Sequence, residues 1–384
     1  MKSLIPYILV IVISLSCCQT KTTENRTVTI DHDFQKVFYP DSGGITGADG
    51  IFSVPLPDGS SAFLNGDCFL GYVRDGARDL STKMLNNSIV IVNADETSAR
   101  SLYRGTYDDP ESLFVPKQPE GGKHWYWPGH GFVEDSIFYM FALHMYTDTT
   151  KIVKSDKPEE ELDKADKMEE MMWSFAVAGV DLLRYNLPDF QLLGVDRVEY
   201  TYDIEFHLGN CVYTEGNDIY LCGTRNDPDG AHIYFGRTQR GNHPYHENWE
   251  FFDGEEWVTD HYQAAPMKLD IGISEQFSIF KIKDKYVLLS MAKMTPDIYT
   301  YTSDYPFKGF ENKTLIYNTP ETDNDPAGKL FTYNALAHPQ YIEGDQLLVS
   351  YCINSSTVRD VFTNVDNYRA RFIRVPLSMI DPSF

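Results

Sequence analysis

Five short turn segments, each followed by an apolar run typical of a β-strand, recur along this chain of 384 residues at intervals of roughly 60 to 80 residues. Each turn is also preceded by an extended run, so each marks a candidate hairpin. Regularly spaced hairpins are typical of blades around an axis, which leaves a central channel. The sequence therefore predicts an all-β fold, a five-bladed β-propeller, with a pair of β-sandwiches as the alternative. The turns are residues 57–60, 134–136, 216–218, 283–285 and 344–346.

The N-terminal segment predicts export. Lys2 precedes an apolar run from Leu4 to Leu15, which is too short for a comfortable membrane span and has the layout of a signal peptide. A cysteine directly after a small residue resembles a bacterial lipoprotein cleavage site. We therefore expect lipidation of Cys17, which follows Ser16, with Cys18 as the alternative.

These features predict three segments. Residues 1–18 form a lipoprotein signal peptide with its lipidation site, residues 19–33 form a polar tether, and residues 34–384 form the propeller domain. The predicted location is the bacterial cell envelope, with the lipid anchor in the outer membrane and the domain facing either the periplasm or the cell surface.

The net charge of −23 and the absence of a basic run argue against a nucleic-acid partner, because phosphate binding needs clustered lysine and arginine. A neutral or cationic ligand remains compatible with this charge. The 25 tyrosines and 23 phenylalanines mostly fill space between sheets in an all-β protein, and a minority are expected to line a ligand groove.

Two aspartates lie near the open end of the first predicted hairpin, Ile51–Leu56 with Ser61–Leu64. Asp49 and Asp67 face each other directly if the turn has three loop residues, and are diagonal neighbours if it has four. Two nearby carboxylates repel when both are charged, so one holds a raised pKa. Glycosidic cleavage needs such a pair, one group as acid and the other as base or nucleophile. The alternative is that both are turn or capping residues.

An aromatic segment at residues 124–131 combines two tryptophans, a tyrosine and two histidines. One tryptophan is readily explained as a core residue, but the whole set is not. We interpret Trp125, Trp127 and His130 as part of a sugar-binding wall.

Three further residues are predicted to bind substrate. Asn334 and His338 open the fifth unit and could hydrogen-bond sugar hydroxyls; His338 could instead hold a structural ion on the axis or be a satisfied core histidine. Glu275 opens the fourth unit as a third acidic group. No spacing of cysteine and histidine suggests zinc, so no cofactor or metal is predicted apart from that optional ion.

The remaining expectations concern local structure. We expect a strand at Phe34–Tyr39, a solvated charged excursion at Lys154–Glu170, and a strand at Arg369–Val375 that completes an earlier sheet. Cys211 and Cys222 are predicted to lie opposite each other across a two-residue turn. A disulfide is possible there, but unpaired, half-buried thiols are favoured because this pair is a hydrogen-bonded one.

The chain resembles a known family at several of these positions. The segments Gly47–Gly59 and Phe63–Gly71 look like the opening of the bacterial proteins grouped as domains of unknown function 4185 and 5005. Trp127–Gly129, Tyr333–Pro339 and Leu347–Tyr351 fit the same family. The resemblance covers about residue 40 to the end.

This resemblance implies a five-bladed β-propeller. Some relatives form glycoside hydrolase family 183, endo-D-arabinanases whose catalytic acids correspond here to Asp49 and Asp67. His130 is a departure, since many relatives carry an acidic residue there. The expected substrate is a furanoside-containing polysaccharide; the alternatives are a glycan-binding propeller without catalysis and an arabinosidase or fructosidase that uses Glu275.

Overall fold

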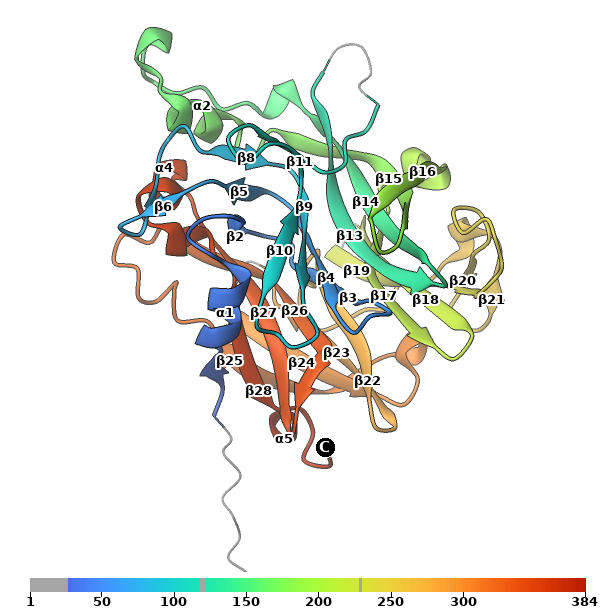
Figure 1. Cartoon of the computed structure of the whole chain (residues 1–384). Helices are drawn as coiled ribbons and strands as arrows, with labels where there is room; N and C mark the ends of the chain where they lie inside the picture. The colour runs from blue at the N-terminus through green and yellow to red at the C-terminus, as the bar shows by residue number, and fades with distance from the viewer. Residues whose placement is uncertain (1–26, 118–121, 228–229, 294) are drawn as a thin grey trace, which may run out of the picture.

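The computed structural model describes residues 27–117, 122–227, 230–293 and 295–384, and in these parts β-strands predominate (Figure 1). The predicted all-β class is confirmed. The signal peptide, Cys17 and Cys18 lie outside the described residues. None of the helices in the described part is both long and apolar enough to cross a membrane.

Within the described residues, five larger antiparallel sheets carry the fold, and each begins with two strands joined by one of the predicted turns. The first contains β3 (Phe52–Pro55), β4 (Ser61–Asn65), β9 (Ser88–Val92) and β10 (Ala99–Leu102). The second contains β13 (His124–Glu134), β14 (Ile137–Thr147), β15 (Phe175–Asn186) and β16 (Gln191–Val198). The third contains β17 (His207–Glu215), β18 (Asp218–Asp227), β19 (Gly230–Gln239), β20 (Glu250–Phe252) and β21 (Trp257–Val258). The fourth contains β22 (Ser278–Ile282), β23 (Lys285–Met291), β24 (Asp297–Ser303) and β25 (Glu311–Asn318). The fifth contains β26 (Leu330–Glu343), β27 (Gln346–Ser355), β28 (Arg371–Pro376) and β1 (Thr29–Ile30).

The turn residues explain these hairpins. Glu215 pairs with Asp218, so only two residues form that loop, as predicted. The first residue of each two-residue turn has a positive φ, which matches the twist of the strands that it joins. The residues are Asp135, Gly216, Lys283 and Gly344.

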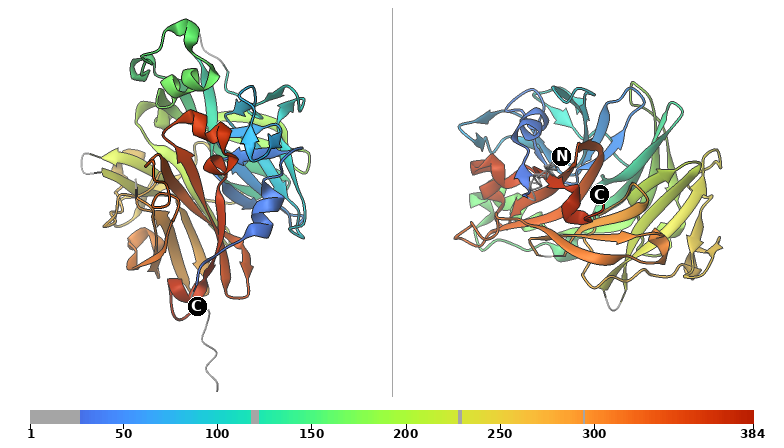
Figure 2. Two further views of the ribbon diagram at one scale, coloured as in Figure 1. Left: turned by 90° about the vertical axis from the view of Figure 1, so that its left-hand side faces the viewer. Right: turned by 90° about the horizontal axis from the view of Figure 1, so that it is seen from below.

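The first strands of the five sheets are neighbours in cyclic order. β3 lies beside β13, β13 beside β17, β17 beside β22, β22 beside β26, and β26 again beside β3. The right view of Figure 2 shows the sheets succeeding one another in this order around the molecule. Residues of all five strands line one pocket of about 530 Å³ near the hairpin turns: Ser53, His130, Val212, Ile279 and Ala337 are examples.

Apolar clusters fill each interface between successive sheets. Phe138 and Leu64 meet between the first and second sheets, and Phe280 meets Val349 between the fourth and fifth. The fifth sheet packs on the first through Leu348 and Phe63. Every sheet is thus buried on both faces, which explains why the strand sequences are apolar runs with little alternation.

The fifth sheet contradicts two expectations. The predicted strand at Arg369–Val375 is β28, but it pairs with β27 in its own sheet and does not complete an earlier one. Instead, the N-terminal β1 pairs with β28, Thr29 opposite Arg374. The folded part therefore begins inside the tether predicted for residues 19–33.

The strand predicted at Phe34–Tyr39 is wrong, because this segment is helix α1 (His32–Phe38). The Asp31 side chain caps the helix by accepting a hydrogen bond from the Phe34 amide at 2.9 Å. Phe34 and Phe38 are four residues apart, so they lie on one helical face and pack together against Phe63.

Smaller elements extend the end of the molecule that carries Asp49. A three-stranded sheet continues the first hairpin, and two-stranded ribbons flank it. These strands are β2 (Ile45–Ala48), β5 (Cys68–Leu70), β8 (Lys83–Leu85), β6 (Val73–Arg74), β7 (Ala77–Arg78), β11 (Arg104–Gly105) and β12 (Pro110–Glu111).

Part of the charged excursion is folded against the body. Helix α2 (Lys164–Met171) is capped by Asp163, and its Ala165 packs on helix α4 (Val358–Thr363). The other helices are short: α3 (Tyr200–Asp203), α5 (Leu377–Ile380), and the 3₁₀ turns η1 (Thr149–Lys151), η2 (Glu159–Glu161), η3 (His261–Gln263), η4 (Pro306–Lys308) and η5 (Val365–Tyr368).

The predicted position of the two cysteines is confirmed, but their predicted half-burial is wrong. Cys211 lies opposite Cys222 in the third sheet. Both thiols are free, but they are fully buried between sheets instead of half-buried.

Candidate functional site

Asp49 and Asp67 lie directly opposite each other where the first hairpin widens. Leu56 and Ser60 hydrogen-bond across the turn, which leaves the three loop residues 57–59. This register continues to Asp49, whose amide donates to the Asp67 carbonyl at 3.1 Å. The structure therefore selects the directly opposed arrangement. Opposed residues place their Cβ atoms about 4.5–5.5 Å apart.

The glycines beside the two aspartates make this close approach possible. A Cβ atom added to Gly66 would come within 2.6 Å of Oδ1 of Asp49. Gly50 has φ +64°, a conformation that other residues rarely adopt. The Asp-Gly and Asn-Gly-Asp sequences thus fold the strands so that both carboxyl groups reach the same recess.

Asp49 accepts two phenol hydrogen bonds from distant parts of the chain. Tyr333 in β26 donates to Oδ2 at 2.8 Å, and Tyr368 in η5 donates to the same oxygen at 2.9 Å. Burial and the neighbouring charge of Asp67 raise the pKa of Asp49 to about 7, although these two hydrogen bonds oppose the rise. Asp49 therefore carries a proton over much of the neutral range.

Asp67 has a different environment, in which donors with N–H groups predominate. Asn86 donates to Oδ1 at 2.9 Å, and the Trp127 indole donates to the same oxygen at 3.0 Å. The pKa of Asp67 is raised above its usual value, because burial outweighs the lowering by these two hydrogen bonds and by the positive charge of Lys123. The two donors and the ammonium favour the ionised form of Asp67 over that of Asp49.

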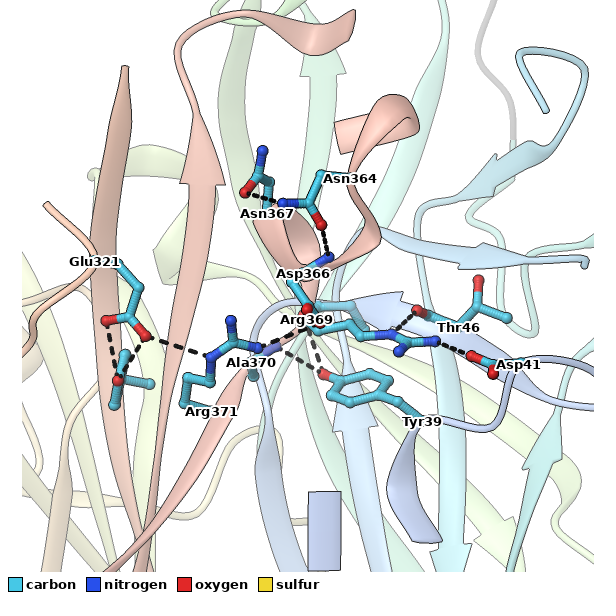
Figure 3. Close-up of polar contacts among 12 residues, drawn as sticks. Tyr39, Asp41, Thr46, Glu321, Asn364, Asp366, Asn367, Arg369, Ala370 and Arg371 are labelled. Carbon is cyan, nitrogen blue, oxygen red and sulfur yellow. Dashed lines mark hydrogen bonds and ion pairs between the residues drawn. The ribbon is translucent and has the colours of Figure 1, made fainter. Parts of the chain in front are cut away.

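The segment behind Asp49 is held by arginines (Figure 3). Arg369 donates to the Thr46 carbonyl at 2.9 Å and pairs with Asp41 at 2.9 Å. Tyr39 accepts a hydrogen bond from the Ala370 amide at 3.3 Å. These contacts fasten η5 to β2, which positions the Tyr368 hydroxyl on Asp49.

A buried guanidinium completes this support. Arg78 is only 4% exposed, and it donates to the carbonyls of Thr46 and Val361, each at 2.6 Å. Burial lowers its pKa to about 9. Arg78 thereby ties β2, the strand before Asp49, to α4.

The aromatic segment divides between the site and the core. Trp127 is at the site through its bond to Asp67, and Trp125 lies beside it with ring centroids 6.0 Å apart. His130 lies apart from these two tryptophans and lines the pocket between the five sheets. Its Nδ1 accepts from the Val212 amide at 2.9 Å and its Nε2 donates to the Ser53 carbonyl at 3.1 Å, so this histidine joins three sheets.

His338 is also a core residue. It has no exposed surface, and its ring nitrogens bond Ser53 at 2.7 Å and Ser350 at 2.8 Å. Burial lowers its pKa to about 3, so it stays neutral. The predicted roles in sugar or ion binding are therefore corrected in favour of the satisfied core histidine.

Asn334 and Glu275 lie at the same end of the molecule as Asp49. Asn334 follows Tyr333 in a strand irregularity with φ +53° and accepts a hydrogen bond from Ser274 at 2.9 Å. Glu275 follows Ser274 and accepts from His207 and Thr224, each at 3.1 Å. Although burial alone would raise its pKa, His207 and Lys293 lower it to about 2. Glu275 is thus a fixed negative charge and not a proton donor.

Sequence reasoning missed four residues of this site: Asn86, Lys123, Tyr333 and Tyr368. Tyr333 was visible in the segment that opens the fifth unit, but nothing local connects it with Asp49. Within the described residues, no group of three or more histidine, cysteine, aspartate or glutamate side chains is arranged to hold a metal ion. The arrangement instead offers two adjacent carboxyl groups with unequal proton affinity.

The family described as Domain of unknown function (DUF5005) matches residues 31–377. No curated protein matches the sequence. The chain is similar to the crystal structure of a putative hydrolase from Bacteroides ovatus ATCC 8483, with 20% identity, a TM-score of 0.71, and coverage of 91% of this chain and 90% of that chain.

Weaker similarities involve two other solved structures. One is an α-L-arabinofuranosidase from Podospora anserina, with 11% identity, a TM-score of 0.44, and coverage of 88% of this chain and 93% of that chain. The other is a GH43_1 enzyme from Xanthomonas citri, with 11% identity, a TM-score of 0.44, and coverage of 89% and 92%. At such identities the similarities concern the fold alone.

Proposed function

Because the chain belongs to the family described as Domain of unknown function (DUF5005) and sets two carboxyl groups against each other, we propose that it is a glycoside hydrolase. The observation that carries this proposal is the opposed pair Asp49 and Asp67, whose surroundings separate their proton affinities. The proposed substrate is a furanoside-containing polysaccharide, cleaved in the manner of an endo-D-arabinanase. The choice of a furanoside as the substrate rests on the resemblance of the first hairpin to glycoside hydrolase family 183.

The proposed architecture is a five-bladed β-propeller, in which each larger sheet is one blade. The cyclic order of the first strands and the pocket lined by all five of them support this proposal. The apolar clusters between successive sheets, including the contact of the fifth with the first, support it further. A pair of β-sandwiches would not give this cyclic succession of interfaces.

In the proposed mechanism Asp49 is the general acid. Its pKa of about 7 keeps a proton available for the leaving oxygen of the glycosidic bond. Asp67, held by Asn86 and Trp127, acts in its carboxylate form as the base for water or as the nucleophile. The two phenols on Asp49 stabilise the carboxylate that remains after it has given up its proton.

Glu275 takes a binding role in this proposal. Its charge is fixed by His207 and Lys293, so it suits hydrogen bonds to sugar hydroxyls better than proton transfer. Trp125, Trp127 and Asn334 line the same end of the molecule and are proposed as further substrate contacts.

The test is a panel of polysaccharides that includes D-arabinan, with released reducing ends as the readout. We expect D-arabinan to be cleaved, and we expect Asp49→Asn or Asp67→Asn to lower turnover about 10²–10⁴-fold. Unchanged turnover in either variant would contradict the assignment. Binding without reducing ends from any polysaccharide would favour a glycan-binding propeller without catalysis.

Lipid anchoring at Cys17 or Cys18 remains part of the proposal, together with an outer-membrane location. β1 runs from Thr29 towards Ile30 and enters its sheet from the end with the turn at residues 344–345. Asp49 lies at the opposite end, so a tether would leave the proposed site facing away from the membrane. Partition of the expressed chain into detergent, lost in the Cys17→Ala or Cys18→Ala variant, tests the anchor.

A further inference from the structure

A second pocket lies beside the proposed catalytic pair. Its volume is about 420 Å³, within the range of small-ligand sites, and Asn86, Ser112 and Trp125 are among its lining residues. Asn86 connects it directly to the site, because its side chain donates to Asp67 while its backbone amide donates to Ser112 at 3.0 Å. The pocket therefore adjoins Asp67 through Asn86.

The charge of this pocket is opposite to that of the chain. The protein has 33 lysines and arginines against 56 aspartates and glutamates, yet among the described residues the pocket is lined by Lys83, Arg104 and Lys123 with Glu111 as the one acidic side chain. A random sample of this surface would show an acidic excess. The three cations converge from β8, β11 and the residue before β13.

The three cations remain available to a ligand in different degrees. Lys83 pairs with Asp109, and Arg104 pairs with Glu111 at 2.9 Å. Lys83 and Arg104 are about half exposed, so these surface pairs are weak and easily exchanged for another anion. Lys123 forms no ion pair within the described part of the chain, and its ammonium lies 5.4 Å from the Trp125 ring centroid.

The aromatic and polar floor suits a sugar. Trp125 lines the pocket and is 9% exposed, although its indole nitrogen is buried and has no hydrogen-bond partner among the described residues. Arg104 donates to the Ser112 carbonyl at 2.9 Å, which orients the guanidinium along the wall. A sugar unit with an oxyanion would thus contact the cations and the exposed part of the tryptophan.

We propose that this pocket is a substrate subsite for a sugar unit that carries an oxyanion, either a uronic acid carboxylate or a phosphate ester, next to the bond that Asp49 and Asp67 cleave. The proposal rests on the proposed function and narrows its substrate class. It makes the natural glycan acidic, although the net charge of the protein is −23.

The test measures binding, so that it does not depend on hydrolysis. Isothermal titration of the Asp49→Asn variant compares D-arabinose 5-phosphate with D-arabinose, and D-glucuronate with D-glucose, at low and high salt. We expect at least one anionic sugar to bind about tenfold more tightly than its neutral counterpart, and we expect added salt to reduce this preference. The phosphate and carboxylate arms identify which oxyanion is recognised.

The matched variants are Lys83→Gln with Arg104→Gln in the pocket, and Lys313→Gln as the control. Lys313 also forms an exposed ion pair, with Asp270, but on β25 in another sheet. The double variant should remove the preference, while the control should keep it. Equal binding of anionic and neutral sugars, or a preference that survives in the double variant, would overturn the proposal. If the protein binds the anionic sugar more tightly but cleaves no polysaccharide, the proposed hydrolase activity is contradicted while the anionic subsite is retained.

Discussion

Asp49 and Asp67 face each other across the first hairpin, with the Asp49 amide bonded to the Asp67 carbonyl at 3.1 Å. Their side chains have separate sets of partners, phenols on Asp49 and N–H donors on Asp67. Both sets of donors lower the pKa of the carboxyl group that they contact, whereas burial raises both pKa values and the charge of Asp67 adds to the rise at Asp49.

The phenols that contact Asp49 predict a shift of the pH profile. Tyr333→Phe or Tyr368→Phe removes a hydrogen bond that stabilises ionised Asp49, so the pKa of Asp49 should rise above about 7. Because the acid must be protonated, the alkaline limb of kcat/KM should move up by about one pH unit. Tyr299→Phe, whose hydroxyl bonds Asp297 on an outer strand, should leave the profile unchanged.

Trp127 contacts Asp67 and Trp125 does not, so replacing each tryptophan tests the hydrogen bond to Asp67 with a matched control. Trp127→Phe keeps an aromatic ring but removes the donor to Asp67, so the pKa of Asp67 should rise and the acidic limb should move to higher pH. Trp125→Phe removes an indole nitrogen that has no partner in the described residues, and should not move that limb. Equal shifts in both variants would refute the role of this hydrogen bond.

The raised pKa of Asp49 also predicts a stability change. The folded value is about 7 against 3.8 for the ordinary carboxyl, so its contribution is complete below about pH 4 and is lost as the pH rises through 7. Asp49→Asn cannot ionise and should escape this loss. The free energy of unfolding of the variant minus that of the wild type should therefore be larger at pH 8 than at pH 4 by roughly 1–4 kcal/mol. The lower end of this range is expected because Asp49 is partly exposed. If the stability difference between the wild type and Asp49→Asn were the same at both pH values, the raised pKa would be contradicted.

Glu275 should affect binding more than chemistry. Glu275→Gln removes a charge that His207 and Lys293 hold in place, so KM should rise about five- to twentyfold while kcat changes about twofold or less. Glu250→Gln breaks a comparable ion pair with Arg237 on an outer strand and serves as the control. A large fall in kcat with unchanged KM would instead make Glu275 part of the chemistry.

The parts of the fold that depend on local sequence were predictable. The two-residue turn at Gly216 was predicted, whereas the first turn was left open between three and four loop residues, and its three-residue form brings Asp49 opposite Asp67. Helix α1 was missed because Phe34 and Phe38 bury one helical face, a spacing that a short apolar segment shares with a strand.

The residues that complete the site could not be found in this way. Tyr333 and Tyr368 lie 284 and 319 positions from Asp49 in the sequence, so only the closure of the fold brings them together. His338 was misassigned because a histidine can satisfy both ring nitrogens between sheets, and sequence alone does not separate that use from ligand binding.

The most direct measurement compares two leaving groups in the two aspartate variants. In an aryl glycoside of the cleaved oligosaccharide, the aryl oxide departs without being protonated. In the polysaccharide, the departing sugar oxygen needs a proton from the acid. Asp49→Asn should lose about 10²–10⁴-fold in kcat/KM on the polysaccharide but little on the aryl glycoside, and Asp67→Asn should lose activity on both. Full loss on both substrates for Asp49→Asn, with activity kept by Asp67→Asn on the aryl glycoside, would contradict the assignment of acid and carboxylate.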